Sequence, residues 1–153
     1  MKMMLKSILL ALALTSLCSA KAIKRLAENY ENEVQAVSVQ GRLFCGSKIL
    51  KGIHVKLIDR DHGDDKDDLL GEAHTDEHGD FHITGGTQES TKIEPAIKIY
   101  HDCNDADKKC QKKLFWDIPH YYVTTKLDAI SVFDIGSVNL EITFGNEQRD
   151  CLH

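Results

Sequence analysis

The stretch GIHVKLID, residues 52–59, decides the fold of this chain. Ile53, Val55 and Leu57 lie on one face of an extended segment, and the residues between them are polar. An apolar period of two residues is typical of a strand with one buried face and one solvated face. This stretch therefore predicts a half-buried β-strand.

The same period recurs on both sides of this stretch, and turn-forming residues separate the repeats. Alternating segments are AVSVQGRLF (36–44), IKIYHDC (97–103), KKLFWDI (112–118) and VFDIGSVNLEITF (132–144). Turn signals lie at 45–47, 62–65, 77–79, 85–86 and 118–120. Seven or eight short strands are expected, with at most one helical turn near residues 120–128. The fold class is all-β, a two-sheet β-sandwich of immunoglobulin-like or related topology.

Residues 1–20 have the parts of a secretory signal peptide. Lys2 and Lys6 supply its positive charge, residues 8–17 form its apolar run, and cleavage is expected after Ala20, with Ala22 as the alternative. An apolar run of about ten residues is too short for a membrane span, which needs about 20. A lipoprotein anchored at Cys18 is the other alternative, but the large Leu17 before it argues against this.

Residues 21–35 form a polar N-terminal extension before the sandwich domain, residues 36–153. A short helix is the alternative for this extension, although isolated helices of this length are marginal. Its dibasic pair, Lys24-Arg25, is a candidate processing site, and an uncut pair of surface charges is the simpler interpretation.

The net negative charge of the chain limits the kinds of partner that it is expected to bind. The chain carries 24 acidic residues against 19 Lys and Arg, a formal net charge of −5. Loss of the leader removes two lysines and no acid. A modestly acidic protein is not expected to bind nucleic acid through a phosphate-neutralising face, so a nucleic-acid partner is not expected. The mature part has no second apolar run of membrane length, so no transmembrane segment is expected.

Three ordered motifs carry a family resemblance. They are Gly41-Arg42-Leu43-Phe44-Cys45, the hairpin Thr75-Asp76-Glu77-His78-Gly79-Asp80-Phe81, and Ile99-Tyr100-His101-Asp102-Cys103 followed by Phe133-Asp134-Ile135-Gly136 and the tail Arg149-Asp150-Cys151-Leu152-His153. In the hairpin, Asp76 can bond the turn backbone, Gly79 can take a positive φ, and Phe81 can enter the core.

Over about residues 37–153, this set resembles the nematode transthyretin-like family of small secreted proteins. The resemblance implies a prealbumin-like sandwich and an extracellular location, without hormone transport. Hydroxyisourate hydrolases share that fold and end in Tyr-Arg-Gly-Ser, which this chain lacks, so no catalytic residue is predicted.

The cysteine count indicates an oxidising compartment. Cys18 is lost with the leader, which leaves Cys45, Cys103, Cys110 and Cys151 for two disulfides. Four cysteines allow three pairings. Because Cys103 and Cys110 are close in sequence and flank a polar loop, Cys103–Cys110 is favoured, which leaves Cys45–Cys151.

Metal sites and cofactors are not predicted, although two groups of residues were candidates. His74, His78 and His82 lie near one turn, with His54 as a neighbour, and suit Zn²⁺ or Cu²⁺; scattered surface histidines are the alternative. The loop Asp59–Asp68 holds six aspartates and suits weak Ca²⁺ binding; it departs from the EF-hand pattern at Gly63 and Leu70, and a solvated loop is the alternative.

Other residues suggest chemistry only weakly. His101-Asp102 beside Cys103 resembles part of a triad, but no G-x-S-x-G elbow is present and the thiol is expected to be oxidised. Trp116 or the pair Tyr121-Tyr122 could anchor a partner, and a core position is the alternative.

The sequence therefore predicts a secreted, non-enzymatic binding or signalling module. Its expected partner is an extracellular protein, a lipid or a small apolar ligand, and its expected state is a monomer or weak homo-oligomer. The alternatives are a hydroxyisourate-hydrolase-type enzyme and a structural component of the extracellular matrix.

Overall fold

The computed structural model describes residues 34–61, 66–105, 108–125 and 131–152. The expected leader, the pair Lys24-Arg25 and residues 62–65 of the acidic loop lie outside the described residues. The described residues form nine strands and one 3₁₀ turn. In chain order these are β1 (Val34–Cys45), β2 (Lys48–Ile49), β3 (His54–Asp59), β4 (Asp68–His74), β5 (Asp80–Gln88), β6 (Pro95–His101), β7 (Gln111–Asp117), η1 (His120–Tyr122), β8 (Val132–Asn139) and β9 (Gln148–Asp150).

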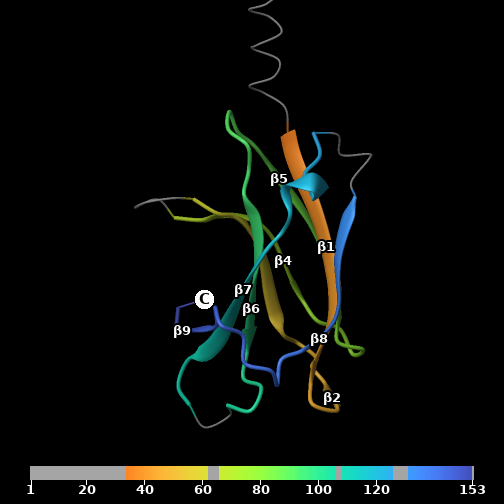
Figure 1. The fold of residues 1–153 in the computed structure, drawn as a ribbon, viewed down its shortest axis with the longest axis vertical. Helices are drawn as coiled ribbons and strands as arrows, with labels where there is room; N and C mark the ends of the chain where they lie inside the picture. The colour runs from red at the N-terminus through yellow and green to blue at the C-terminus, as the bar shows by residue number, and fades with distance from the viewer. Residues whose placement is uncertain (1–33, 62–65, 106–107, 126–130, 153) are drawn as a thin grey trace, which may run out of the picture.

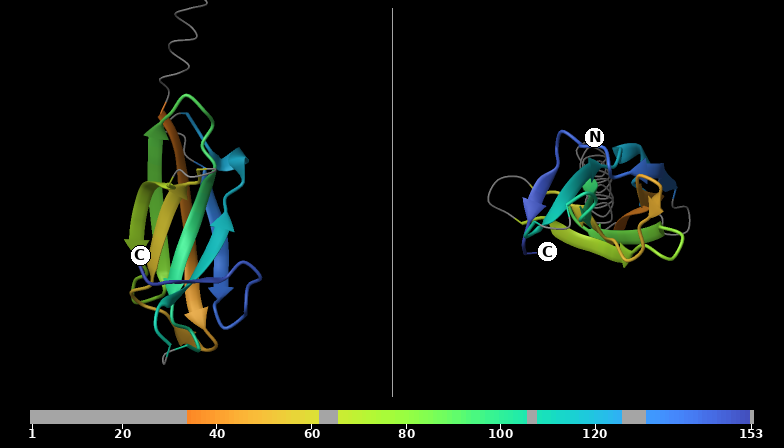
Figure 2. Two further views of the ribbon diagram at one scale, coloured as in Figure 1. Left: turned by 90° about the vertical axis from the view of Figure 1, so that its left-hand side faces the viewer. Right: turned by 90° about the horizontal axis from the view of Figure 1, so that it is seen from below.

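The strands form two sheets that pack face to face (Figure 1). In the first sheet β1 is central, with β2 and β5 antiparallel to it and β8 parallel to it. The second sheet has the order β4-β3-β6-β7-β9, and all its pairs are antiparallel. The view from below in Figure 2 shows the two layers. The expected two-sheet all-β sandwich is confirmed.

The core lies between the sheets, as the apolar alternation predicts. Val37 and Val39 of β1 are fully buried, and they face Val55 and Leu57 of β3 across the interior. Burial of each such side chain stabilises the fold by about 1.5–3 kcal/mol. In β7, Leu114 and the half-buried Trp116 point inward together, so Trp116 belongs to the core margin.

Strand β1 begins earlier than the expected domain boundary. It starts at Val34, so Val34 and Gln35 of the expected extension belong to the sheet. The buried Gln35 side chain donates a hydrogen bond to the carbonyl of Thr91 (2.5 Å) and accepts one from the amide of Ile93 (3.2 Å). The burial of Gln35 could not be predicted from its polar neighbours in the sequence, because it depends on a segment about 56 residues away.

The prediction of a turn at Gly85-Gly86 is wrong, because both glycines lie inside β5. A side chain at Gly85 would place its Cβ 2.3 Å from the carbonyl oxygen of Leu70 in β4. The glycine therefore permits close approach of two strands that belong to different sheets.

The predicted disulfide pairing, Cys103–Cys110 with Cys45–Cys151, is also wrong. The bonds are Cys45–Cys103 and Cys110–Cys151, with Cα–Cα distances of 5.7 and 4.4 Å. Strand β6 ends at His101, and Cys103 then turns into the core, where it meets Cys45 at the end of β1 in the opposite sheet. Cys45–Cys103 therefore joins the two sheets.

Strand β9 explains the second bond. Gln111 pairs with Asp150 in the β7–β9 ladder, so Cys110 and Cys151 are the next residues along the same register. The segment from 140 to 147 carries the chain from β8 across to β9 (Figure 1). The sequence around β9 has no apolar alternation, so it predicts neither this strand nor the register that would indicate the pair.

Candidate functional site

The outward face of the first sheet forms an open groove of about 530 Å³. Its strands are β1, β5 and β8, and neighbouring positions are set by register: Gln40 pairs with both His82 and Asp134, and Arg42 pairs with Asp80. Because side chains alternate along a strand, these residues face solvent while Val39 and Leu43 face the core. We refer to this feature as the β1–β5–β8 groove; its further lining residues are Gly41, Asp76, Phe81, Gly136 and Ser137.

A bidentate ion pair lies in this groove. Arg42 donates from Nε to Oδ1 of Asp80 (2.6 Å) and from Nη2 to Oδ2 (2.8 Å). These hydrogen bonds hold the pKa of Asp80 below its ordinary value of 3.8 and raise the pKa of Arg42. Both groups are therefore charged at neutral pH, and the fork geometry fixes their orientation.

Asp134 supplies a second carboxylate from β8. Its Oδ2 accepts a hydrogen bond from Gln40 Nε2 (3.0 Å), and its Oδ1 accepts one from the amide of Gly136 (2.7 Å). These bonds, that from Gln40 first, lower the pKa of Asp134 below 3.8. The carboxylate is therefore ionised and held in a fixed position.

Asp76 supplies a third carboxylate, from the turn that the sequence singled out. Its Oδ1 accepts hydrogen bonds from the amides of His78 (2.8 Å) and Asp80 (2.9 Å), and Gly79 has a φ of 77°. Phe81 is buried. The predicted hydrogen bonds of Asp76 are confirmed. The predicted hairpin is wrong, because the turn joins β4 of one sheet to β5 of the other.

A serine–histidine contact lies beside the groove. Ser38 Oγ is 3.0 Å from His82 Nε2 and 2.9 Å from Thr84 Oγ1, and it donates to the carbonyl of Ile83 at 3.3 Å. Ser38 is only 1% exposed. A nucleophile must reach its substrate, so this buried hydroxyl is placed to join β1 to β5.

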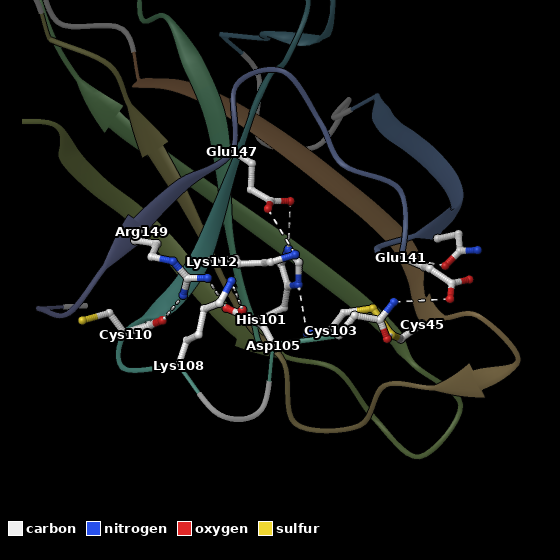
Figure 3. Close-up of polar contacts among 12 residues, drawn as sticks. Cys45, His101, Cys103, Asp105, Lys108, Cys110, Lys112, Glu141, Glu147 and Arg149 are labelled. Carbon is white, nitrogen blue, oxygen red and sulfur yellow. Dashed lines mark hydrogen bonds and ion pairs between the residues drawn. A yellow bond between two sulfur atoms is a disulfide. The ribbon is translucent and has the colours of Figure 1, made fainter.

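A second polar cluster, of His101, Asp105, Lys108, Glu147 and Arg149, lies between Cys110 and the Cys45–Cys103 disulfide (Figure 3). His101 is fully buried, and its Nδ1 accepts a hydrogen bond from the amide of Cys103 (3.3 Å). The neutral ring therefore carries its proton on Nε2, which lies 3.7 Å from Glu147 Oε2. Burial lowers the pKa of His101 below 6.5, although Glu147 acts in the opposite direction.

Arg149 of β9 completes this cluster. Its Nη2 lies 2.6 Å from Oδ2 of Asp105, whose side chain is 1% exposed, and its Nη1 donates to the carbonyl of Cys110 (3.0 Å). Lys108 lies 3.4 Å from the other oxygen of Asp105. The Arg149-Asp150-Cys151 tail of the sequence motif thus fastens β9 to the loop before β7. In the motif His101-Asp102-Cys103, Cys103 is bonded to Cys45 and Asp102 accepts a hydrogen bond from Gln111, so the three residues do not form a catalytic triad.

The candidate metal ligands do not converge. His74 stacks on His54 with ring centroids 4.6 Å apart, on the outer face of the second sheet, and His82 lies on the first sheet. His54 Nε2 also contacts Glu72 Oε2 at 2.9 Å. Among the residues that the structure describes, no group of three or more His, Cys, Asp or Glu is placed to hold a metal ion.

The described ends of the acidic loop hold neighbouring strands. The buried Asp59 accepts a hydrogen bond from the amide of Glu94 (2.6 Å), and Asp67 pairs with Lys98 Nζ (2.5 Å). Burial raises the pKa of Asp59 above 3.8, against the effect of the bond from Glu94. These two aspartates are therefore engaged in contacts within the fold.

The aromatic candidates divide between surface and core. Tyr121 is 86% exposed, whereas Tyr122 packs on Phe133 with ring centroids 4.9 Å apart. Both belong to the short 3₁₀ turn η1, which agrees with the expected helical turn. The described part of the chain contains no helix of the length and apolarity needed to span a membrane.

Comparisons with known proteins show which family this chain resembles. The family model described as the transthyretin-like family matches residues 40–119. Transthyretin-like protein 33 of Caenorhabditis elegans is 45% identical over 119 residues, which cover 78% of this chain and 83% of that protein. Transthyretin-like proteins 5 and 46 of the same organism are 43% and 42% identical, over 78% and 77% of this chain and 86% and 66% of those proteins.

A disulfide-linked, two-sheet sandwich is the class of protein that the fold defines. The chain belongs to the transthyretin-like family, as the sequence motifs predicted.

Proposed function

We propose that this protein is a secreted, non-enzymatic binding module that holds a basic segment of an extracellular protein in the β1–β5–β8 groove. The charge of the groove is the observation that carries the proposal. Three carboxylates, of Asp76, Asp80 and Asp134, line it together with one guanidinium, that of Arg42. A partner with Lys or Arg side chains is complementary to this surface.

The lining also favours a protein over the other expected partners. A small apolar ligand needs a concave, mainly apolar pocket, and the residues named above are charged or polar. An anionic lipid headgroup would be repelled by the excess of carboxylates. The groove is open to solvent, as suits an extended segment of a larger partner.

The burial of Ser38 supports a non-enzymatic role. Ser38 contacts His82, but its hydroxyl is covered and is shared with Thr84 and Ile83. We expect no hydrolysis of hydroxyisourate, and turnover abolished by His82→Ala would favour the enzyme instead.

Secretion rests on the leader and on the two disulfides. Disulfides persist in oxidising compartments, so their presence supports an extracellular site of action. Expression of the full chain in a secreting cell should yield a product in the medium that begins at Lys21. Retention of an uncleaved product inside the cell would contradict this.

The test of the groove uses a fluorescent pentalysine peptide as probe, with pentaglutamate as its opposite-charge control. Oxidised protein should bind pentalysine and not pentaglutamate, with affinity that falls as salt screens the charges. Asp134→Asn keeps the acceptor for Gly136 and removes one charge, so it should weaken binding by about two- to fivefold.

Asp117→Asn is the matched control, because Asp117 lies on β7 of the other sheet, where it pairs with Arg60. This variant should bind pentalysine as the natural protein does. Equal binding of both peptides, or an equal effect of both substitutions, would contradict the proposal.

A further inference from the structure

The two disulfides have different surroundings. Cys103 is 4% exposed and belongs to the core cluster, and its partner Cys45 is half-buried against that cluster. Cys151 is exposed and Cys110 is half-buried. A thiolate must reach a sulfur atom to exchange with it, so access separates the two bonds. We propose that Cys110–Cys151 is a thiol-exchange site that takes an extracellular dithiol as its reductant, whereas Cys45–Cys103 is structural.

The backbone at Cys110 favours opening of this bond. Cys110 has a φ of 70°, in the left-handed region that non-glycine residues rarely adopt. The bond holds Cys110 beside Cys151, at the end of the β7–β9 ladder. Opening the bond allows the residue to leave this conformation, so part of the backbone strain is released.

The charges near Cys110 favour it as the leaving group. Arg149 donates a hydrogen bond to its carbonyl, and Lys108 and Lys109 precede it in the chain. Asp105 and Asp150 are the opposing charges; Asp105 is paired with Arg149 and Lys108, and Asp150 is paired with Lys113. Cationic neighbours stabilise a thiolate.

The reaction balances as two thiol–disulfide exchanges. A thiolate of the dithiol attacks Sγ of Cys151, which forms a mixed disulfide and releases Cys110 as a thiolate that takes up a proton. The second thiol of the reductant then attacks the mixed disulfide and releases Cys151. Two electrons pass to the protein, and the dithiol becomes a disulfide.

Reduction should release β9, because this strand has little apolar anchoring. It spans three residues, none of them fully buried, and the following Leu152 is 96% exposed. Its other contacts are the three-residue ladder with β7 and ion pairs such as Lys113–Asp150 at 2.9 Å and Arg149–Asp105. Without the covalent link, this short ladder and these ion pairs must offset the conformational entropy that the strand gains on release.

The released form would present a new surface. The β7 edge at Gln111–Lys113 loses its partner strand, and Lys112 and Lys113 lose Glu147 and Asp150. An unpaired strand edge is a template for pairing with another chain. Reducing conditions outside the cell would therefore expose the β7 edge with its two lysines, and oxidising conditions would keep this edge covered.

The test is limited reduction of the natural, fully oxidised protein. Thioredoxin with its reductase and NADPH serves as the dithiol, alkylation traps free thiols, and peptide mass analysis locates them. Cys110 and Cys151 should be alkylated at least about tenfold faster than Cys45 and Cys103. Simultaneous labelling of all four, or labelling of the Cys45–Cys103 pair first, would overturn the proposal, as would resistance of both bonds.

Hydrogen exchange separates release of β9 from general unfolding. In the singly reduced protein, amides of residues 111–113 and 148–150 should lose protection, while those of β1 and β3 keep it. The double variant Cys110→Ser/Cys151→Ser should show the same local loss. Its matched control, Cys45→Ser/Cys103→Ser, should lose protection across both sheets. Protection unchanged at 111–113 would show that β9 stays in place, which would overturn the release.

Discussion

Gln35 ties the first strand to the segment before β6 with hydrogen bonds that only the folded chain provides. Replacement by Ala leaves the buried amide of Ile93 and the carbonyl of Thr91 without this partner. We expect Gln35→Ala to lower the free energy of unfolding by about 1–3 kcal/mol, as measured in a denaturant titration. Gln148→Ala, on the exposed strand β9, is the control and should change it by less than about 0.5 kcal/mol. Equal effects would contradict the role of Gln35.

His101 should make stability depend on pH. Burial lowers its pKa in the folded protein, so the unfolded chain binds the proton more readily. Its contribution to stability is therefore fully present above the ordinary pKa of 6.5 and is lost as pH falls through the folded pKa.

The variant His101→Asn isolates this effect. Asn offers an oxygen to the amide of Cys103 but does not titrate within this range. Its unfolding free energy should lie below that of the natural protein at neutral pH, and the difference should shrink as pH falls below 6.5. Denaturant titrations at several pH values measure it. A difference that stays constant with pH would contradict the assignment.

At the scale of elements, the close approach of β4 and β5 depends on Gly85. A Cβ there meets the backbone oxygen of Leu70, which cannot rotate away as a side chain can. We expect Gly85→Ala to cost about 1–3 kcal/mol of unfolding free energy. Gly145→Ala meets nothing within 4 Å and should be nearly neutral. Thermal unfolding of the two variants compares them directly, and similar melting temperatures would show that the strands adjust freely.

The local pattern of each strand was predictable, whereas contacts between distant elements were not. Period-two alternation predicted β3 and β7, and the sequence of the Asp76 turn predicted its hydrogen bonds, because both are local properties. The prediction of the disulfide pairing was wrong because the Cys110–Cys151 bond depends on β9, a three-residue strand with no apolar alternation of its own.

The groove was missed for a similar reason. Gln40, His82 and Asp134 are far apart in the sequence, and strand register alone brings them side by side. The polar positions of each alternating segment were visible as solvent-facing residues. The parallel pairing of β1 with β8 decides which of these polar residues share a face, and the sequence pattern does not show this pairing.

For the whole molecule, we expect a monomer in solution. The edge strand β8 is continuous but irregular. Its Gly136 has a φ of 68°, and its register with β1 shifts between Gln40 and Arg42. Such irregularities make an edge a poor template for pairing with a second copy. Native mass spectrometry of the oxidised protein should give one chain, and a dominant tetramer would contradict this.

The excess of carboxylates in the β1–β5–β8 groove makes this groove the proposed binding surface of the molecule. Nuclear magnetic resonance of the labelled, oxidised protein during titration with pentalysine would locate the binding surface residue by residue. We predict that the amide signals that move belong to Gln40, Arg42, Asp80, His82 and Asp134, in one saturable set. Shifts confined to the outer face of β3, β6 and β7, or no shifts at low salt, would show that the groove does not bind this peptide.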